Sequence, residues 1–151
     1  MQESKLLQLN PALGLKNGIY QNQEALFRDS TLSNYIQVAV NEVFDQVDDK
    51  SLFSTDIESA LTTPELRDAL SLSQFAFLQA FNFSKVHQAL DLSEDFGGVA
   101  HFLADQVGHL DAVKLDPDLA RLSVRRCANK HNISHISEDL TRLKFPKHHY
   151  D

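Results

Sequence analysis

Two sets of three residues have side chains that can bind metal ions, and the residues of each set are four positions apart. The first set is His101, Asp105 and His109. On a helix, this spacing places two imidazoles and a carboxylate on one strip, and these groups are common ligands of zinc and iron. The apolar residues of the same stretch fall on the opposite side of a helix. We therefore expect the strip to face solvent, and a metal or proton-transfer site is the alternative.

The second set is Cys127, His131 and His135. One thiolate and two imidazoles would supply three of the four ligands of a tetrahedral zinc site. However, Asn132 is a common helix-terminating residue that would turn His135 off the strip, and no paired cysteine supplies the fourth ligand. We therefore expect Cys127 to be a small buried side chain beside a core histidine, and we expect no cofactor.

Residues 123–144 combine a helical pattern with a turn residue and a second polar stretch. Ala128, Asn132 and Ile133 stand where a small residue, a turn residue and an apolar residue are found in helix-turn-helix proteins, so the segment resembles the first helix and turn of that motif. The basic residues that would contact phosphates are Arg125, Arg126, Lys130, Arg142 and Lys144. Glu138 and Asp139 would begin the second helix and repel phosphates, so we expect no binding of nucleic acid and interpret the segment as a packing corner.

A Leu-Arg patch is predicted on the outer side of the same helix. Leu122 stands among Arg121, Arg125 and Arg126 when the helix is drawn with Ala120 and Val124 facing the core. An apolar side chain ringed by guanidinium groups is typical of protein-contact surfaces. These four residues are our predicted protein-binding site.

Phenylalanine is dense between residues 75 and 83, where Phe75, Phe77, Phe81 and Phe83 occur. Four rings at this spacing cannot share one side of a helix. We expect this helix to be central in the protein, and an apolar ligand pocket or a dimer face is the alternative.

The elements that would position these residues are predicted to be helical. Apolar residues recur at intervals of three and four, and Thr63-Pro64 and Asp116-Pro117 have the pattern of helix starts. We expect helices near residues 31–48, 55–60, 64–70, 73–91, 95–112, 117–131 and 137–144. The prediction is an all-α, compact, single-domain helical bundle of five to seven helices over residues 31–151, with residues 1–30 as a loosely structured arm or docking segment.

Composition and charge narrow the class of function. The chain carries a net charge of −7, with −9 over residues 31–115 and +2 over residues 116–151. The beginning of the sequence has no signal-peptide pattern, no apolar run is long enough to cross a bilayer, and Cys127 is the single cysteine. We therefore expect a cytoplasmic protein that does not bind membranes.

Because several common catalytic motifs are absent, we expect a protein without enzymatic activity more than an enzyme. The sequence leaves the question of enzymatic activity open. The sequence contains no glycine-rich phosphate loop, no nucleophile elbow and no paired-cysteine motif. We predict a non-enzymatic protein-binding or regulatory helical module, which is an adaptor, an inhibitor or a self-associating protein. Its partner would be another protein or its own copy. The alternatives are a DNA-binding regulator that uses residues 123–144 and a metal-binding helical bundle that uses the histidine, cysteine and aspartate strips.

Overall fold

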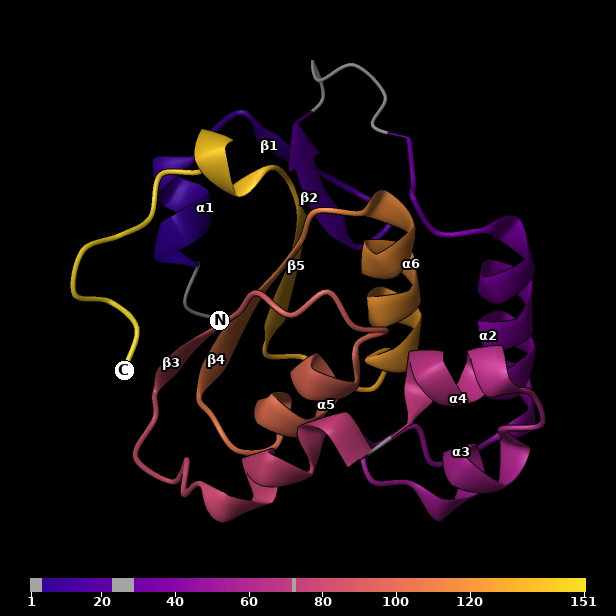
Figure 1. Ribbon diagram of the computed structural model, residues 1–151. Coiled ribbons are helices and arrows are strands. Elements are labelled where there is room, and N and C mark those ends of the chain that lie inside the picture. The colour runs from indigo at the N-terminus through magenta and orange to yellow at the C-terminus, as the bar shows by residue number, and fades with distance from the viewer. Residues whose placement is uncertain (1–3, 23–28, 72) are drawn as a thin grey trace.

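The protein has an α/β fold built on a five-stranded mixed sheet (Figure 1). The computed structural model describes residues 4–22, 29–71 and 73–151. In chain order the elements are α1 (Lys5–Leu9), β1 (Leu13–Lys16), β2 (Ile19–Asn22), α2 (Asn34–Gln46), α3 (Thr55–Ala60), α4 (Pro64–Leu70), the 3-10 helix η1 (Ser73–Ala80), β3 (Gln88–Asp91), α5 (Gly98–Ala104), β4 (His109–Lys114), α6 (Pro117–Arg126), β5 (Ile133–Ser137) and the 3-10 helix η2 (Leu140–Arg142). The strand order is β1-β2-β5-β4-β3.

The prediction of an all-α bundle was therefore wrong. The predicted helix over 73–91 divides into η1 and β3, and the predicted helix over 95–112 divides into α5 and the start of β4. Strands β2 to β5 pair in parallel, and a parallel sheet covered on both faces does not show the alternation of polar and apolar residues that marks a strand. The strands are also only four to six residues long, so their apolar residues fit a helical period equally well.

The N-terminal hairpin is part of this sheet. Asn17 and Gly18 both have a positive φ, of 51° and 81°, which is the conformation that a type I′ turn between two antiparallel strands requires. The second strand of the hairpin pairs in parallel with β5 through Tyr20 and Ile136. The described part of the predicted arm therefore docks on the rest of the chain.

The helical predictions were correct in the middle of the chain. The helix predicted over 31–48 is α2, and Thr63 and Asp116 are the N-caps of α4 and α6 with side chains that accept from first-turn amides. In contrast, α6 ends at Arg126, five residues earlier than predicted, and only η2 lies within 137–144. Strand β5 begins at Ile133, directly after the expected turn residue Asn132, and the stretch of the expected second helix contains only η2, so the helix-turn-helix motif is not formed.

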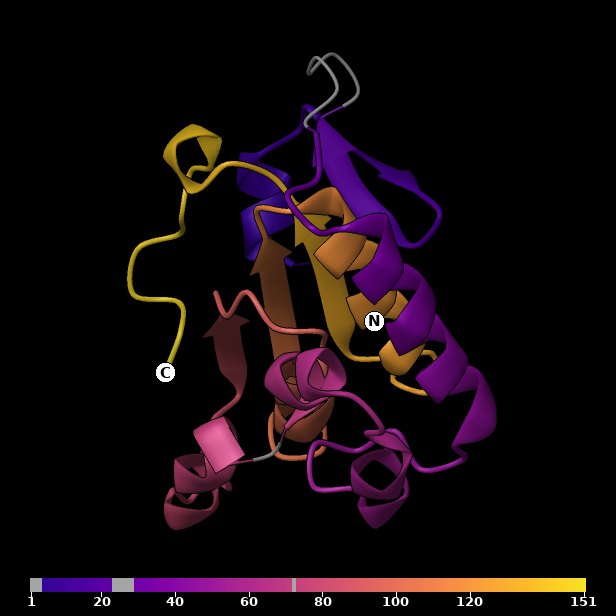
Figure 2. The same ribbon diagram turned by 45° about the vertical axis from the view of Figure 1, so that its right-hand side comes forward.

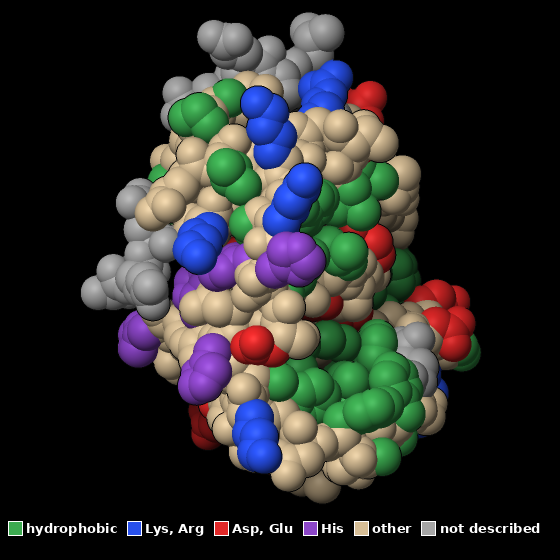
Figure 3. All heavy atoms as spheres, turned by 90° about the vertical axis from the view of Figure 1, so that its left-hand side faces the viewer, with side chains coloured by type: hydrophobic (Ala, Val, Ile, Leu, Met, Phe, Trp, Pro, Cys, Tyr) green, Lys and Arg blue, Asp and Glu red, His purple; other side chains and the backbone are tan. Residues whose placement is uncertain are grey.

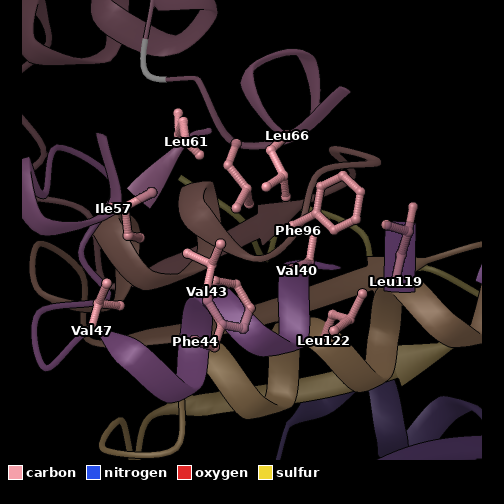
Figure 4. Close-up of a cluster of buried hydrophobic side chains, with 11 residues drawn as sticks. Val40, Val43, Phe44, Val47, Ile57, Leu61, Leu66, Phe96, Leu119 and Leu122 are labelled. Atoms are coloured by element: carbon pink, nitrogen blue, oxygen red, sulfur yellow. The ribbon is translucent and has the colours of Figure 1, made fainter. Parts of the chain in front are cut away.

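The sheet separates two apolar layers. Leu110 and Ala112 pack on α5 on one face, whereas Val113 and Ile136 pack on Leu6 of α1 on the other face. The helix α6 lies between the sheet and α2, which is seen best when the molecule is turned (Figure 2). A third cluster fills the space between α2, α3, α4 and α6 and is built from residues that include Val40, Phe44, Ile57, Leu66 and Leu119 (Figure 4). In the described parts of the chain, no helix has the length and apolar character that crossing a membrane requires.

Candidate functional site

The carboxyl ends of the parallel strands are closed by a buried ion cluster. Proteins with open α/β sheets usually bind ligands at this edge. Here Lys114, the last residue of β4, places its Nζ 3.3 Å from Asp91 Oδ2 and 2.7 Å from Asp95 Oδ1. The same ammonium group donates to the Ser93 carbonyl oxygen, and the Lys114 residue is 1% exposed. The usual crevice is therefore filled by side chains of the chain itself.

The charges in this cluster hold each other in the ionised state. Burial alone would raise the pKa of Asp95, but the attraction and hydrogen bond of Lys114 outweigh it, and the net effect lowers the pKa. Burial would likewise lower the pKa of Lys114, but Asp95 and Asp91 raise it above its ordinary value. Gly97, which follows the cluster in the chain, packs closely against α6. A Cβ atom at this position would lie 2.6 Å from the Ser123 Cα atom.

A polar pocket of about 410 Å³ lies at the opposite end of the sheet. Its lining comes from the loop after α2, from α5 and the residue that follows it, and from the end of α6 with the turn after it. The pocket is lined by Asp48, Asp49, Lys50, Ser51, His101, Asp105, Arg125, Arg126, Ala128, Asn129 and Lys130. Five of these residues belong to three of the predicted sites, namely the first histidine strip, the Leu-Arg patch and the DNA-binding set.

The cations of this pocket have different partners. Lys130 forms an ion pair with Asp105, and Arg125 forms an ion pair with Asp45 of α2. Arg126 is 3% exposed, and it donates through Nε to the Lys50 carbonyl oxygen at 2.8 Å and through a terminal nitrogen to the Ser51 carbonyl oxygen at 3.0 Å. The acceptors of Arg126 are uncharged, so its buried positive charge is not neutralised by them.

His101 is the second buried group of the pocket. The residue is 5% exposed, and its Nδ1 atom has no hydrogen-bond partner among the described residues. Burial, followed by the positive charges of Lys130 and Arg126, lowers the pKa of His101 to about 4. The imidazole is therefore neutral near pH 7. The prediction that His101 faces solvent was wrong, because the α5 face that carries it is packed in the interior.

The two predicted metal strips are not assembled. Between α5 and β4 the chain turns, and His109 lies in the sheet, 3.3 Å from Asp111 Oδ1 and apart from His101 in the same predicted strip. In the second set, His131 is exposed in a turn after α6, whereas His135 is buried in β5, 3.4 Å from the Ser123 hydroxyl. Within residues 4–22, 29–71 and 73–151, no group of three or more His, Cys, Asp and Glu side chains is placed to hold a metal ion.

Cys127 is buried, as the sequence analysis predicted. The residue is 2% exposed, and its Sγ atom lies 3.6 Å from the Gly97 carbonyl oxygen. Burial raises the pKa of the Cys127 thiol to about 12. Burial also lowers the pKa of His135 in β5 to about 4. The thiol is therefore protonated near pH 7 and is a poor nucleophile.

The Leu-Arg patch is not an exposed surface. Leu122 is 4% exposed and belongs to the apolar cluster between α2 and α6, and Arg126 is buried as well. The prediction was wrong because α6 is covered on two sides, by the sheet and by α2, instead of on one side. Of the four residues, Arg121 remains exposed and pairs with Asp118, and Arg125 is half-buried.

The remaining predicted DNA contacts are dispersed. Arg142 is an exposed residue of η2, and Lys144 is an exposed residue whose backbone amide donates to Asn10. Both follow β5 in the chain, and neither lines the pocket that Arg125, Arg126 and Lys130 line.

An aromatic surface at η1 was underestimated by the sequence analysis, which favoured central packing. Phe77 and Phe81 are 58% and 61% exposed, and their ring centroids lie 6.3 Å apart. The series of ring contacts continues inward through Phe83 and Phe102 to Phe53. In Figure 3, the side of the molecule that lies on the left in Figure 1 faces the viewer. The lower half of this view shows a contiguous patch of hydrophobic side chains at the level of η1. The signal in the sequence was the four phenylalanines themselves, which cannot all be buried by one short element.

Comparison with known proteins gives little overlap. No protein-family model matches the chain, and no curated protein matches it. One solved structure, described as StiE O-MT residues 942-1257, overlaps with this chain at a TM-score of 0.42 and 19% sequence identity. The overlap covers 72% of this chain and 46% of the other, so the chain spans less than half of that solved structure.

Proposed function

We propose that the chain is a non-enzymatic, self-associating module that binds a second copy of itself through the aromatic surface at η1. The observation that carries this proposal is the exposure of Phe77 and Phe81 at 58% and 61%. Large aromatic side chains provide most of the binding energy in many protein interfaces, and contiguous exposed apolar patches are uncommon on monomers.

The charge of the surrounding chain favours a second copy as the partner. Residues 69–84 contain no charged side chain and no histidine, although the whole chain carries a net charge of −7. The cores of interfaces are depleted in charge, and those between identical subunits are the more apolar ones. Two copies that meet at this segment bring no like charges into contact, whereas a basic partner would find no acidic group there to steer it.

Two further features support a binding role over catalysis. At the carboxyl ends of the strands, the ion cluster of Lys114, Asp91 and Asp95 uses its charges internally. The edge strand β3 follows η1 in the chain, and its first residue Gln88 is already bonded to Asp151, so the aromatic surface of η1 and not the start of this edge is the surface offered to a second chain. The cytoplasmic location expected from the sequence remains a prediction that cell fractionation would test.

Sedimentation velocity on the purified chain tests the proposal, with loading from about 1 µM to about 300 µM to bracket micromolar affinity. We expect a monomer–dimer equilibrium for the unmodified chain. In the double variant Phe77→Ser/Phe81→Ser, we expect the dissociation constant to rise at least about 30-fold, as for the loss of an interface hot spot of about 2 kcal/mol.

The matched control is Tyr35→Ser/Val38→Ser on α2, which removes two apolar side chains that are 59% and 49% exposed. This control should dimerise like the unmodified chain. The proposal fails if the unmodified chain is monomeric at every concentration. It also fails if the two double variants dimerise equally well.

A further inference from the structure

The polar pocket lined by the loop after α2, by α5 and by the end of α6 has an inner part and a rim of different character. Its volume of about 410 Å³ falls within the range of about 300–1,000 Å³ that is typical of small-molecule sites. The inner residues are Arg126 and His101, which are 3% and 5% exposed. The rim residues Asp48, Asp49 and Asp105 are exposed.

The inner part favours a negatively charged group. Arg126 donates to the uncharged backbone oxygens of Lys50 and Ser51, and the carboxylates of Asp95 and Asp49 attract its buried positive charge without accepting either of these hydrogen bonds. The neighbouring Nδ1 atom of His101 is buried without a hydrogen-bond partner among the described residues. A buried polar atom that makes no hydrogen bond is costly, and a ligand that supplies the partner removes this cost. A carboxylate next to Arg126 also forms a charge-assisted hydrogen bond of the strong kind.

The rim favours a positively charged group. Asp105 has a side chain that is 54% exposed, and it shares its charge with Lys130. Asp49 is held ionised, because its pKa is lowered mainly by the Ser51 backbone amide. The whole lining carries the three carboxylates of the rim and four cations, so a ligand with both signs of charge matches it better than a ligand with one sign; the cations are Lys50, Arg125, Arg126 and Lys130.

We propose that this pocket binds a small zwitterion, of amino-acid or dipeptide size, with its carboxylate directed toward Arg126 and His101 and its ammonium group at the acidic rim. This site is separate from the aromatic surface, and it does not depend on self-association. The arrangement uses both signs of charge that the pocket offers. An anion alone would leave the rim unmatched, and an amine alone would leave Arg126 unmatched.

Isothermal titration calorimetry on the full chain tests the proposal with the free α-amino acids and a set of dipeptides as probes. Each binding probe is compared with its N-acetyl form, which lacks the ammonium group, with its amide, which lacks the carboxylate, and with inorganic phosphate. We expect at least one zwitterion to bind, and we expect both blocked forms to bind about 10-fold to 100-fold more weakly, as for a lost charged hydrogen bond. Inorganic phosphate should bind more weakly than the zwitterion.

Two variants separate the pocket from nonspecific binding. His101→Phe keeps a ring of similar size and removes the polar nitrogen, and Asp105→Asn removes one rim charge at an exposed position where folding is not at risk. Each should weaken the binding of the zwitterion at least about 10-fold. The control is Asp68→Asn, which removes an exposed carboxylate of α4 that does not line the pocket, and it should leave binding unchanged.

Three results would overturn the proposal. The first is no binding of any free amino acid or dipeptide at millimolar concentration. The second is a blocked form or phosphate that binds as tightly as the zwitterion. The third is a zwitterion whose affinity is unchanged in both pocket variants, because that ligand would occupy another place on the protein.

Discussion

Replacement of Lys114 by methionine should destabilise the protein strongly. The change keeps most of the side-chain volume and removes the ammonium group that lies 3.3 Å from Asp91 and 2.7 Å from Asp95, both of which have nearly buried carboxylates. Breaking a buried ion pair by removal of one partner costs about 3–5 kcal/mol, because the other charge is left buried without compensation. With a urea dependence of about 2 kcal/mol per molar, the unfolding midpoint should fall by roughly 1.5–2.5 M.

The contribution of Asp95 to the acid response should have the opposite sign in the variant and in the unmodified chain. In the unmodified chain, the pKa of Asp95 is below its ordinary value of 3.8, so its contribution to stability is present above that value and is lost as the pH falls through the folded pKa. Without Lys114, burial dominates and raises the pKa of Asp95. The contribution is then most favourable below pH 3.8 and is lost as the pH rises. The difference in unfolding free energy between the two proteins should therefore shrink from pH 7 to pH 4.

Urea unfolding followed by circular dichroism at both pH values measures these differences. The control is Arg67→Met, which removes the cation of an exposed ion pair with Glu58 and should cost less than about 1 kcal/mol at either pH. A cost below about 1 kcal/mol for Lys114→Met at pH 7 would refute the reasoning about the cluster. A cost that stays constant between the two pH values would refute the reasoning about Asp95.

Three other properties follow from buried groups. His101 and His135 both have a pKa lowered to about 4 from 6.5, so they are neutral in the folded protein, and acidification from pH 6.5 to pH 4 should remove up to about 3 kcal/mol of unfolding free energy for each one. Urea midpoints across this range measure the loss, and a flat profile would contradict it. Gly97→Ala should cost at least about 2 kcal/mol, because φ is 81° and the added Cβ atom would lie 2.6 Å from the Ser123 Cα atom; an unchanged thermal midpoint would contradict this. The thiol of Cys127, 2% exposed and with a pKa raised to about 12, should react with a disulfide reagent only after denaturation, and rapid labelling of the folded protein would show that the site opens.

The parts of the fold that the sequence predicted well are those determined by local chemistry. The cap residues Thr63 and Asp116, each followed by proline, begin helices in the structure as predicted. The helix α2 was found because its apolar residues form one long stripe. In contrast, the Asn17-Gly18 pair is a strong local signal for a hairpin, and it was interpreted as part of a loose segment because the strands on either side have only four residues each.

The residues of the first histidine strip are separated for a different reason, which is topology. Residues 101, 105 and 109 share a strip only if one helix continues through them, but the chain leaves α5 after Ala104 and enters β4 at His109. The pocket brings His101 of α5 beside Arg126 of α6, and their proximity follows from the pairing of β4 with β5. Spacing along the chain contains no information on such neighbours unless the strands are placed first.

The position of β5 in the sheet determines when the N-terminal hairpin can be covered during synthesis. Tyr20 pairs with Ile136, so residues 13–22 cannot complete their pairing in the sheet until a strand more than a hundred residues later has been synthesised. At a translation rate of about 5–20 residues per second, the delay is on the order of 10 s. During this time the hairpin exposes an unpaired strand edge, which is a template for pairing with another nascent chain. The long-range parallel pairing also predicts slow folding, so the yield of the native protein should depend on chaperones that hold the hairpin until β5 emerges.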